Sequence, residues 1–236
     1  MTQQHGPTRR DFLRHSTAGA AAWAMLVNLD DYRTSAAQTD ERNKTMSKMK
    51  GTKTEQNLLK AFAGESQARG RYTMFSAVAS EEGYEHIAAS FLETAEQERV
   101  HAQQFFQYLD TGEALEITAA YPAGKIGKTE ENLLAAANGE NEEWEKIYPE
   151  FAKIAREEGF ADVARTFTAV AVAEKQHEKR YRGFLARLKA GELFKRESVT
   201  WRCRHCGFVA TGETAPGVCS ACRKPQAWFE ILAENW

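Results

Sequence analysis

Hydrophobic side chains recur at helical spacing over about residues 52–190. Alternating steps of four and three residues place them on one face of each predicted helix. The fourth stripe comprises Val163, Phe167, Val170, Glu174, His177, Tyr181, Phe184 and Leu188, and the third comprises Leu133, Ala137, Glu140, Trp144, Ile147 and Phe151. Two earlier stripes lie within residues 58–79 and 91–109. The pattern predicts four long helices.

The two halves of this helical stretch repeat each other. Thr54–Leu59 matches Thr129–Leu134 at an offset of 75 residues, whereas Gly83 matches Gly159 at an offset of 76. One residue is therefore inserted between the two matches. Both glycines are expected to end the first helix of a pair.

Residues 112–128 contain glycines and a proline and form the connection between the repeats. Two helix pairs joined by one long crossover are the ferritin-like arrangement. The sequence thus predicts a mainly α fold, with a ferritin-like four-helix bundle over residues 48–192.

Acidic side chains interrupt the hydrophobic stripes at positions that should face the core. They are Glu65, Glu98, Glu140 and Glu174. Several unpaired buried carboxylates are not stable without compensating cations. His101 and His177 each follow one of these acids by three residues and share its helix face. A single Glu-x-x-His pair is usually a solvated surface feature, but two in register, each with a further core glutamate, predict a di-iron carboxylate site.

Glu143 breaks the symmetry of the repeat, because Ala68 occupies the matching position. It lies one helical turn after Glu140 and could give one metal a choice of ligands. The alternative is an exposed acid without a ligand role.

All four cysteines lie near the end of the chain, as Cys203-x-x-Cys206 and Cys219-x-x-Cys222. Two such pairs predict a four-thiolate metal site, here in a small knot over residues 198–236. Spacing does not separate iron from zinc, so a structural zinc ribbon stays open. Two disulfides are the remaining alternative.

Residues 1–45 have the pattern of an export signal rather than of a folded domain. Arg9-Arg10 precedes a weakly apolar segment and the small residues Ser35–Ala37, which is typical of a twin-arginine signal. It predicts a periplasmic protein. If Met46 is the true start, the protein is cytoplasmic.

The net charge and the lengths of the apolar runs limit the kinds of binding partner that the sequence predicts. The net charge of −2 gives no reason to expect a nucleic acid. No apolar run reaches the roughly 18–20 residues of a membrane helix, so no transmembrane segment is expected in the mature chain.

With the bundle and the knot in one chain, residues 48–236 resemble the rubrerythrin family. The likeness rests on Gly51–Leu59, Gly64–Arg69, Glu93–Arg99, Gly139-Glu140 with Glu143, Ala173-Glu174 with His177–Arg180, and the four cysteines followed by Pro225–Glu230. The resemblance implies a non-haem di-iron peroxidase that reduces hydrogen peroxide to water, with an attached rubredoxin-like iron centre bound by Cys203, Cys206, Cys219 and Cys222.

The resemblance also implies roles for the bundle residues. Glu98 and Glu174 would bridge the irons, and Glu140 and His177 would complete one of them. Glu65 would hold the other, whose last ligand would exchange between Glu143 when oxidised and His101 when reduced. Tyr72 and Tyr148 would support these ligands.

Electrons would come from an external reductase or electron carrier, one at a time through the knot. A head-to-tail homodimer or higher homo-oligomer would let the knot of one chain serve the irons of another. The rival interpretation is a ferritin-like protein for iron oxidation and storage that carries a structural zinc ribbon.

Overall fold

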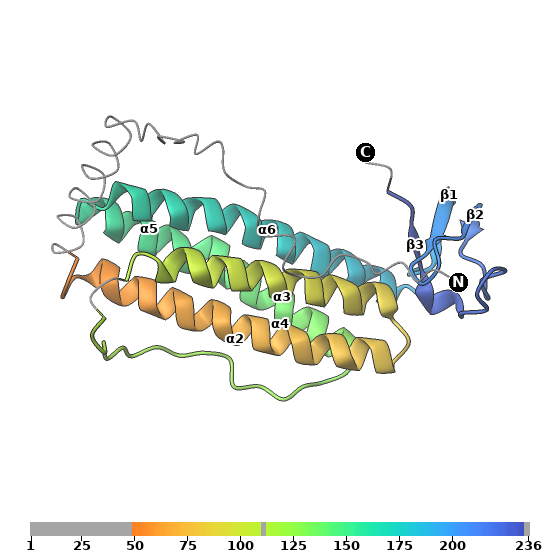
Figure 1. Cartoon of the computed structure of the whole chain (residues 1–236), viewed down its shortest axis with the longest axis horizontal. Coiled ribbons are helices and arrows are strands. Elements are labelled where there is room, and N and C mark those ends of the chain that lie inside the picture. The colour runs from red at the N-terminus through yellow and green to blue at the C-terminus, as the bar shows by residue number, and fades with distance from the viewer. Residues whose placement is uncertain (1–48, 110–111, 234–236) are drawn as a thin grey trace, which may run out of the picture. The chain divides into compact units, whose positions relative to one another are not determined.

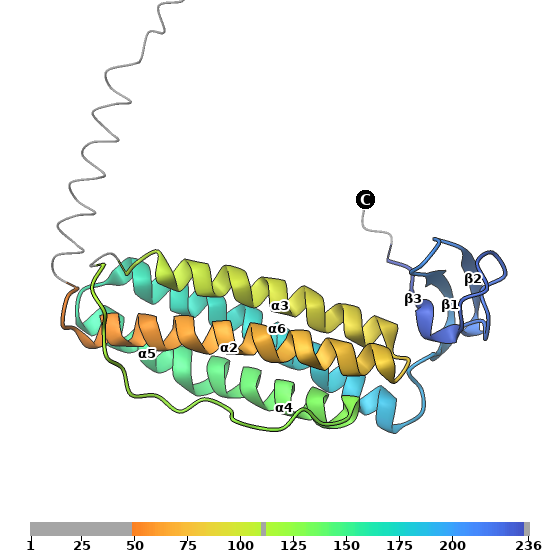
Figure 2. The same ribbon diagram turned by 60° about the horizontal axis from the view of Figure 1, so that its bottom comes forward.

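The computed structural model describes residues 49–109 and 112–233. Its helices are α2 (Lys53–Glu81), α3 (Glu85–Phe106), α4 (Thr129–Glu142), α5 (Tyr148–Glu157) and α6 (Ala161–Lys189), with a π-helical segment η2 (Glu143–Ile147) joining α4 to α5. α2 pairs with α3, and α4 and α5 pair with α6. The chain between α3 and α4 runs along the outside of α2 and α4 (Figures 1 and 2). The ferritin-like bundle predicted from the sequence is confirmed.

The two repeats cap each other's first helix. The carboxylate of Glu158 accepts hydrogen bonds from the Lys53 and Thr54 backbone N–H groups, at 3.1 and 2.8 Å, at the start of α2. Glu82, the matching acid, accepts from the Thr129 N–H at the start of α4, at 3.1 Å. Each acid satisfies N–H groups that a helix leaves free at its N-terminus and complements the helix dipole. This reciprocal exchange ties the two repeats together.

The third helix departs from the straight stripe predicted from the sequence. After Glu140 the next large buried side chain is Tyr148, whereas Ile147 and Phe151 are only partly buried. The sequence pattern placed Ile147 and Phe151 on the buried stripe, which was wrong by one position, because Tyr148 and Ala152 are the buried residues. The π turn of η2 takes up one extra residue without ending the helix, which shifts every later side chain.

This π turn is also the inserted residue of the sequence repeat. Glu65 and Glu140 are 75 residues apart, whereas Tyr72 and Tyr148 are 76 apart. The offset changes between positions 140 and 148, which is the interval that holds η2.

Two hydrophobic clusters fill the bundle, one on each side of the acids. One contains Tyr72, Phe75, Phe91, Leu133 and Tyr181, and the other contains Leu58, Phe105, Tyr148, Val163 and Phe167. On each helix the glutamate lies in sequence between residues of the two clusters. Burial of large side chains on both sides therefore holds the acids in the interior.

The C-terminal knot is a three-stranded antiparallel sheet in the order β2-β1-β3. Its elements are β1 (Lys195–Cys203), β2 (Val209–Thr214), the 3₁₀ turn η3 (Gln226–Trp228) and β3 (Phe229–Ile231). Trp201 and Phe229 are buried against Cys203 and Cys219. Gly207 has a φ of 79° directly after Cys206, a conformation that glycine adopts without strain.

The predicted twin-arginine leader over residues 1–45 lies outside the described residues. Within the described ranges, no helix combines the length and the apolar character needed to span a membrane.

Candidate metal centres

Six of the seven predicted bundle ligands meet at one buried place between the helices. Their ligand atoms form two overlapping groups, each with all atoms within 4.8 Å of one another. One group is Glu65, Glu98, His101 and Glu174, and the other is Glu98, Glu140, Glu174 and His177. Glu98 and Glu174 belong to both groups, and all four glutamates are at most 1% exposed.

The shared carboxylates each turn one oxygen toward each histidine. Oε1 of Glu174 lies 2.8 Å from Nδ1 of His101, and Oε2 lies 2.7 Å from Nδ1 of His177. Oε2 of Glu98 lies 3.0 Å from the His101 nitrogen, and Oε1 lies 3.1 Å from the His177 nitrogen. Two carboxylates that each face two ligand groups have the geometry of bridges between two cations.

Two tyrosines hold the remaining carboxylates, each across the repeat boundary. The Tyr72 hydroxyl donates to Oε1 of Glu140 at 2.6 Å, and the Tyr148 hydroxyl donates to Oε1 of Glu65. Both tyrosines are fully buried, and burial together with the neighbouring carboxylate raises their pKa well above the usual value. They therefore stay protonated and act as donors that fix one oxygen of each acid.

The ligand atoms that the tyrosines do not contact are available to a metal. Oε2 of Glu65 and of Glu140, Oε1 of Glu98, both oxygens of Glu174 and Nδ1 of His177 are buried, and none makes a well-directed hydrogen bond, although several lie at ion-pair distance from one another. Buried polar atoms are normally satisfied, so a group of unsatisfied acceptors aimed at one another needs an explanation. Carboxylate oxygens and imidazole nitrogens at this density fit two divalent metal ions.

Gln97 is a functional residue that the sequence reasoning missed. Its Oε1 lies 2.9 Å from Nε2 of His177, and Arg180 donates to the hydroxyl of Thr94 at 2.7 Å and to the same Gln97 oxygen at 3.3 Å. A ligand histidine held through its other nitrogen keeps its ring orientation and tautomer. Gln97 lies beside the Glu-x-x-His motif but belongs to no hydrophobic stripe, and its partner is 80 residues away.

Glu143 is the one predicted bundle ligand that lies apart from both groups. It is half-buried and lines a cavity beside the site. Burial and the neighbouring carboxylates of Glu140, Glu174 and Glu98 raise its pKa well above the usual value, and the charge of Arg71 partly opposes this. In this arrangement His101, rather than Glu143, stands with Glu65.

Burial and the charges of neighbouring side chains shift the pKa values of the metal-free site. Burial and the neighbouring carboxylates raise the pKa of Glu65 and Glu140 well above the usual value. Burial alone would raise the pKa of Glu98, but hydrogen bonds from His101 and His177 outweigh it and lower that pKa to about 2. Burial alone would lower the pKa of both histidines, but hydrogen bonds to the carboxylates raise them to about 10 for His101 and about 12 for His177.

The metal-free bundle is therefore expected to lose stability as the pH rises above neutrality. A histidine whose pKa is raised by folding contributes stability that is complete below its unfolded value of 6.5 and is lost as the pH approaches its folded value. The raised pKa values of the two glutamates act in the same direction. We expect the melting temperature of chelated protein, measured by circular dichroism, to fall by about 5 °C or more between pH 6 and pH 9. Iron-loaded protein is the control and should change less; a rise in the metal-free melting temperature would contradict this electrostatic account.

The four cysteines converge in the knot. Sγ of Cys203 lies 3.8 Å from Sγ of Cys222, and Sγ of Cys206 lies 3.6 Å from Sγ of Cys219. All four sulfur atoms lie within 4.8 Å of one another, and all four cysteines are free. The disulfide alternative is thus not what the structure contains. Four converging thiols fit a tetrahedral metal site.

Comparison with known proteins gives two family matches. The model described as rubrerythrin matches residues 56–185, and the model described as the rubredoxin-like domain of rubrerythrin matches residues 201–230. Rubrerythrin of Porphyromonas gingivalis is 55% identical over 197 residues, which cover 83% of this chain and 96% of that protein. Rubrerythrin of Nitratidesulfovibrio vulgaris is 52% identical over 192 residues, which cover 81% of this chain and all of that protein.

Solved structures agree with these matches. A structure of nigerythrin in its fully reduced, all-ferrous state has a TM-score of 0.53 and 30% identity, and the match covers 78% of this chain and 91% of that one. A bacterioferritin of Desulfovibrio desulfuricans with a di-iron site has a TM-score of 0.52 at 24% identity, which supports the fold alone.

Proposed function

Because the chain belongs to the rubrerythrin family, we propose that it is a peroxidase that reduces hydrogen peroxide to water. The carboxylates and histidines of the bundle fit a di-iron site, and the four cysteines of the knot fit one iron ion, with zinc as the alternative. The observation that carries the proposal is the pair of ligand groups that share Glu98 and Glu174 in a dry interior. Two adjacent metals match a substrate with two adjacent oxygens.

The residues of the chain prepare this site for a two-electron reduction. When bound, two ferrous ions supply one electron each and act as Lewis acids toward the peroxide oxygens. Glu65, Glu98, Glu140, Glu143 and Glu174 carry five negative charges against four positive ones, so the loaded site is close to neutral. Tyr72 and Tyr148 keep the terminal carboxylates in place. The helices shield the oxygens of Glu65, Glu98, Glu140 and Glu174 from bulk water, since each residue is at most 1% exposed.

We further propose the ligand roles that the family resemblance implies. Glu98 and Glu174 would hold both irons, Glu140 and His177 would complete one iron, and Glu65 would hold the other. Nδ1 of His101 lies 4.0 Å from Oε2 of Glu65, and Glu143 lines the adjacent cavity. These positions support an exchange of His101 and Glu143 as the iron changes oxidation state.

Metal analysis combined with rapid kinetics tests the peroxidase proposal. We expect about three irons per chain, the red colour of a ferric tetrathiolate, and reoxidation of the reduced protein much faster by hydrogen peroxide than by air. Two irons with one zinc, and no preference for peroxide, would instead favour an oxidase or storage bundle. A large shell in size-exclusion chromatography would favour storage.

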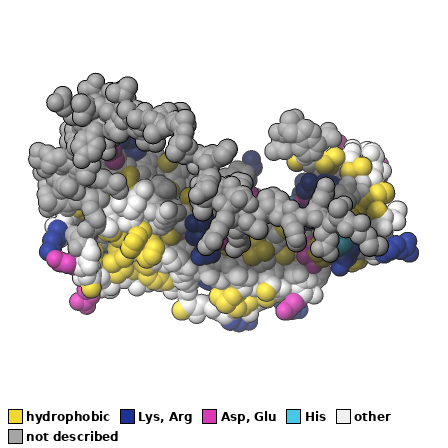
Figure 3. Space-filling model, in the orientation of Figure 1, with side chains coloured by type: hydrophobic (Ala, Val, Ile, Leu, Met, Phe, Trp, Pro, Cys, Tyr) yellow, Lys and Arg dark blue, Asp and Glu magenta, His cyan; other side chains and the backbone are white. Residues whose placement is uncertain are grey.

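The distance along the chain supports a dimeric relay. After His177, α6 continues for twelve residues to Lys189, which is about 18 Å of helix. The first knot cysteine, Cys203, comes later still. A head-to-tail homodimer, in which one knot serves the partner's irons, would shorten the electron path. Large hydrophobic side chains are exposed on the bundle, among them Leu92 and Val172. Figure 3 shows patches of hydrophobic side chains on the face in view.

A mixed dimer tests this relay. Chains with Cys206→Ser and chains with Glu98→Ala should each turn over poorly alone, whereas their mixed dimer should regain activity. Regain requires that electrons cross from one chain to the other. An active strict monomer, or mixed dimers without regained activity, would exclude the head-to-tail relay.

We also propose that the protein is exported by the twin-arginine route and draws electrons from a carrier in the cell envelope. The support is the Arg9-Arg10 segment and the small residues that follow it. Cell fractionation of the full chain should place the protein in the periplasm, and the double variant R9K/R10K should retain it in the cytoplasm. Equal cytoplasmic amounts of both would show instead that Met46 is the working start and that the donor is cytosolic.

A further inference from the structure

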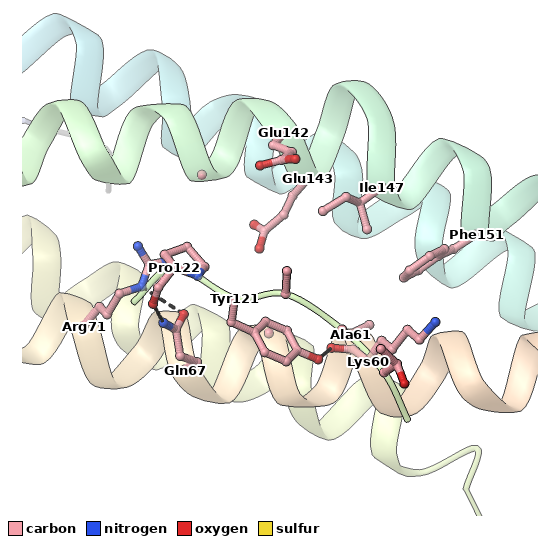
Figure 4. A pocket seen from close by; sticks show the side chains of 15 residues that line it. Lys60, Ala61, Gln67, Arg71, Tyr121, Pro122, Glu142, Glu143, Ile147 and Phe151 are labelled. Carbon is pink, nitrogen blue, oxygen red and sulfur yellow. Dashed lines mark hydrogen bonds between the residues drawn. The ribbon is translucent and has the colours of Figure 1, made fainter. Parts of the chain in front are cut away.

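A cavity of about 280 Å³ lies directly beside the candidate di-iron site. α2 forms one wall, residues 118–122 of the crossover form a second, and the third helix between Gly139 and Phe151 forms the remaining wall (Figure 4). Glu143, the candidate ligand outside both metal groups, projects its carboxylate into this space. The cavity therefore touches the site at the place where one ligand is expected to exchange.

The two ends of the cavity differ in chemistry. In Figure 4 the side chains of Arg71 and Gln67 lie at one end, and those of Ile147 and Phe151 lie toward the other, where Lys60 also lines the cavity. The Glu143 carboxylate lies between the two ends. Such a lining suits a molecule with one small polar group and a small apolar remainder, because apolar surface that packs against Ile147 and Phe151 is removed from water.

Hydrogen bonds fasten the crossover wall to α2. The Tyr121 hydroxyl donates to the carbonyl oxygen of Lys60 at 2.8 Å, and the Gln67 amide donates to the carbonyl oxygen of Pro122 at 2.6 Å. Nε of Arg71 donates to Oε1 of Gln67 at 2.9 Å and holds that amide in place. The cavity is thus preformed, as binding pockets for small molecules usually are.

Two glycines keep the cavity open. Gly64 and Gly139 are equivalent in the two repeats, each directly precedes a candidate ligand, and both line the cavity. Neither has a positive φ, so the helix does not require glycine there. Glycine destabilises a helix relative to alanine. A Cβ at Gly64 would lie 3.6 Å from the ring of Tyr121, and a Cβ at Gly139 would lie 3.7 Å from Nη2 of Arg71, so larger side chains there would occupy the space.

We propose that this cavity is a substrate pocket for small alkyl hydroperoxides, with the –OOH group at Glu143 and the alkyl group against Ile147 and Phe151. The inference rests on the proposed peroxidase function and names a second substrate class for the same site. A water molecule occupies about 30 Å³ in the liquid, and hydrogen peroxide, with one more oxygen, would fill only a small part of the cavity. A branched alkyl group of four carbons fits the remaining space.

The reaction balances as it does for hydrogen peroxide. The O–O bond of ROOH breaks, and two electrons and two protons convert it to the alcohol ROH and water. The electrons come from the same external donor that reduces the iron centres in the proposed peroxidase reaction, and the protons come from solvent. The alkyl group is unchanged, so the pocket need only hold it.

Filling the pocket at Gly64 tests the proposal in iron-loaded protein. We expect the ratio of kcat/KM for tert-butyl hydroperoxide to that for hydrogen peroxide to fall about tenfold or more in Gly64→Leu, with a smaller fall in Gly64→Ala. Gly70→Leu is the matched control, because Gly70 lies in the same helix, is exposed, and has nothing within 4 Å of its Cβ position. Its ratio should equal that of the wild type, and circular dichroism should show that all three variants are folded.

Binding provides a readout that does not depend on turnover. The fluorine NMR line of trifluoro-tert-butanol should broaden with wild type and Gly70→Leu, and much less with Gly64→Leu. If the wild type reduces hydrogen peroxide but neither reduces tert-butyl hydroperoxide nor broadens this line, the pocket proposal is wrong and the peroxidase proposal stands. If neither peroxide is reduced while the alcohol binds at Gly64, the peroxidase proposal and the substrate role of the pocket both fail, and only the binding of small alcohols in the cavity is established.

Discussion

Cys206→Ser is expected to stop steady-state peroxide reduction while it leaves one round of reduction intact. Cys206 is one of four converging thiols, and the variant leaves only three thiolates for the knot iron. We expect kcat to fall by at least about 100-fold, because loss of even an outer-shell partner of a metal typically costs 10–100-fold. Stopped-flow mixing of fully reduced variant with peroxide should still consume about one peroxide per di-iron site, since the two electrons needed are already stored there.

Ser220→Ala is the control for Cys206→Ser. Ser220 directly follows Cys219, is exposed and carries no sulfur, so Ser220→Ala should turn over at the wild-type rate. Full steady-state activity of Cys206→Ser would refute the relay through the knot. Loss of the single round as well would mean that the knot is needed to assemble or reduce the bundle site.

Glu98→Ala is expected to empty the bundle site and leave the knot loaded. Glu98 offers one oxygen to each histidine, so its removal takes a ligand from both metal positions. Iron per chain should fall from about three to about one, and peroxide turnover should fall by about a thousandfold or more. The red absorbance of the knot should be unchanged, which separates loss of the site from loss of the fold.

Glu96→Ala is the matched control, because Glu96 lies in the same helix two residues earlier. Its side chain is 60% exposed and pairs with Arg69 and Arg99 at the surface. Exposed ion pairs contribute little stability, so this variant should keep its iron and its activity. Retention of two bundle irons in Glu98→Ala would show that Glu98 does not bridge them.

The cluster of candidate ligands could be predicted because most of its residues occur in both halves of the repeat. Glutamates on hydrophobic stripes conflict with burial unless something compensates them, and the repeat places histidines beside them in register. The four-cysteine site could be predicted as well, since the Cys-x-x-Cys spacing by itself brings two thiols to one point. Tyr72 and Tyr148 were predicted from the family resemblance, and the structure supplies their hydrogen-bond partners.

Other features depend on contacts that periodicity does not encode. Gln97 holds His177 from a distant helix, and a polar residue off the stripe has no pattern of its own. The cavity depends on the path of residues 112–128, a segment without regular spacing. The π turn moved Ile147 off the central stripe because helical periodicity assumes a constant number of residues per turn. Its only trace in the sequence was the change of offset between the repeats.

The π-helical segment has a consequence for how this kind of chain can arise. Two repeats of equal length would carry equal ligands and build two interchangeable metal positions. One in-frame codon inserted in the second copy lengthens it, and the π turn absorbs the addition without disturbing the flanking helices. Glu143 lines the cavity beside the site, whereas its counterpart Ala68 is buried in the first copy. Gene duplication, a single-codon insertion and a change of residue at position 143 are thus three steps that would turn a symmetric bundle into one whose two ligand groups have different surroundings.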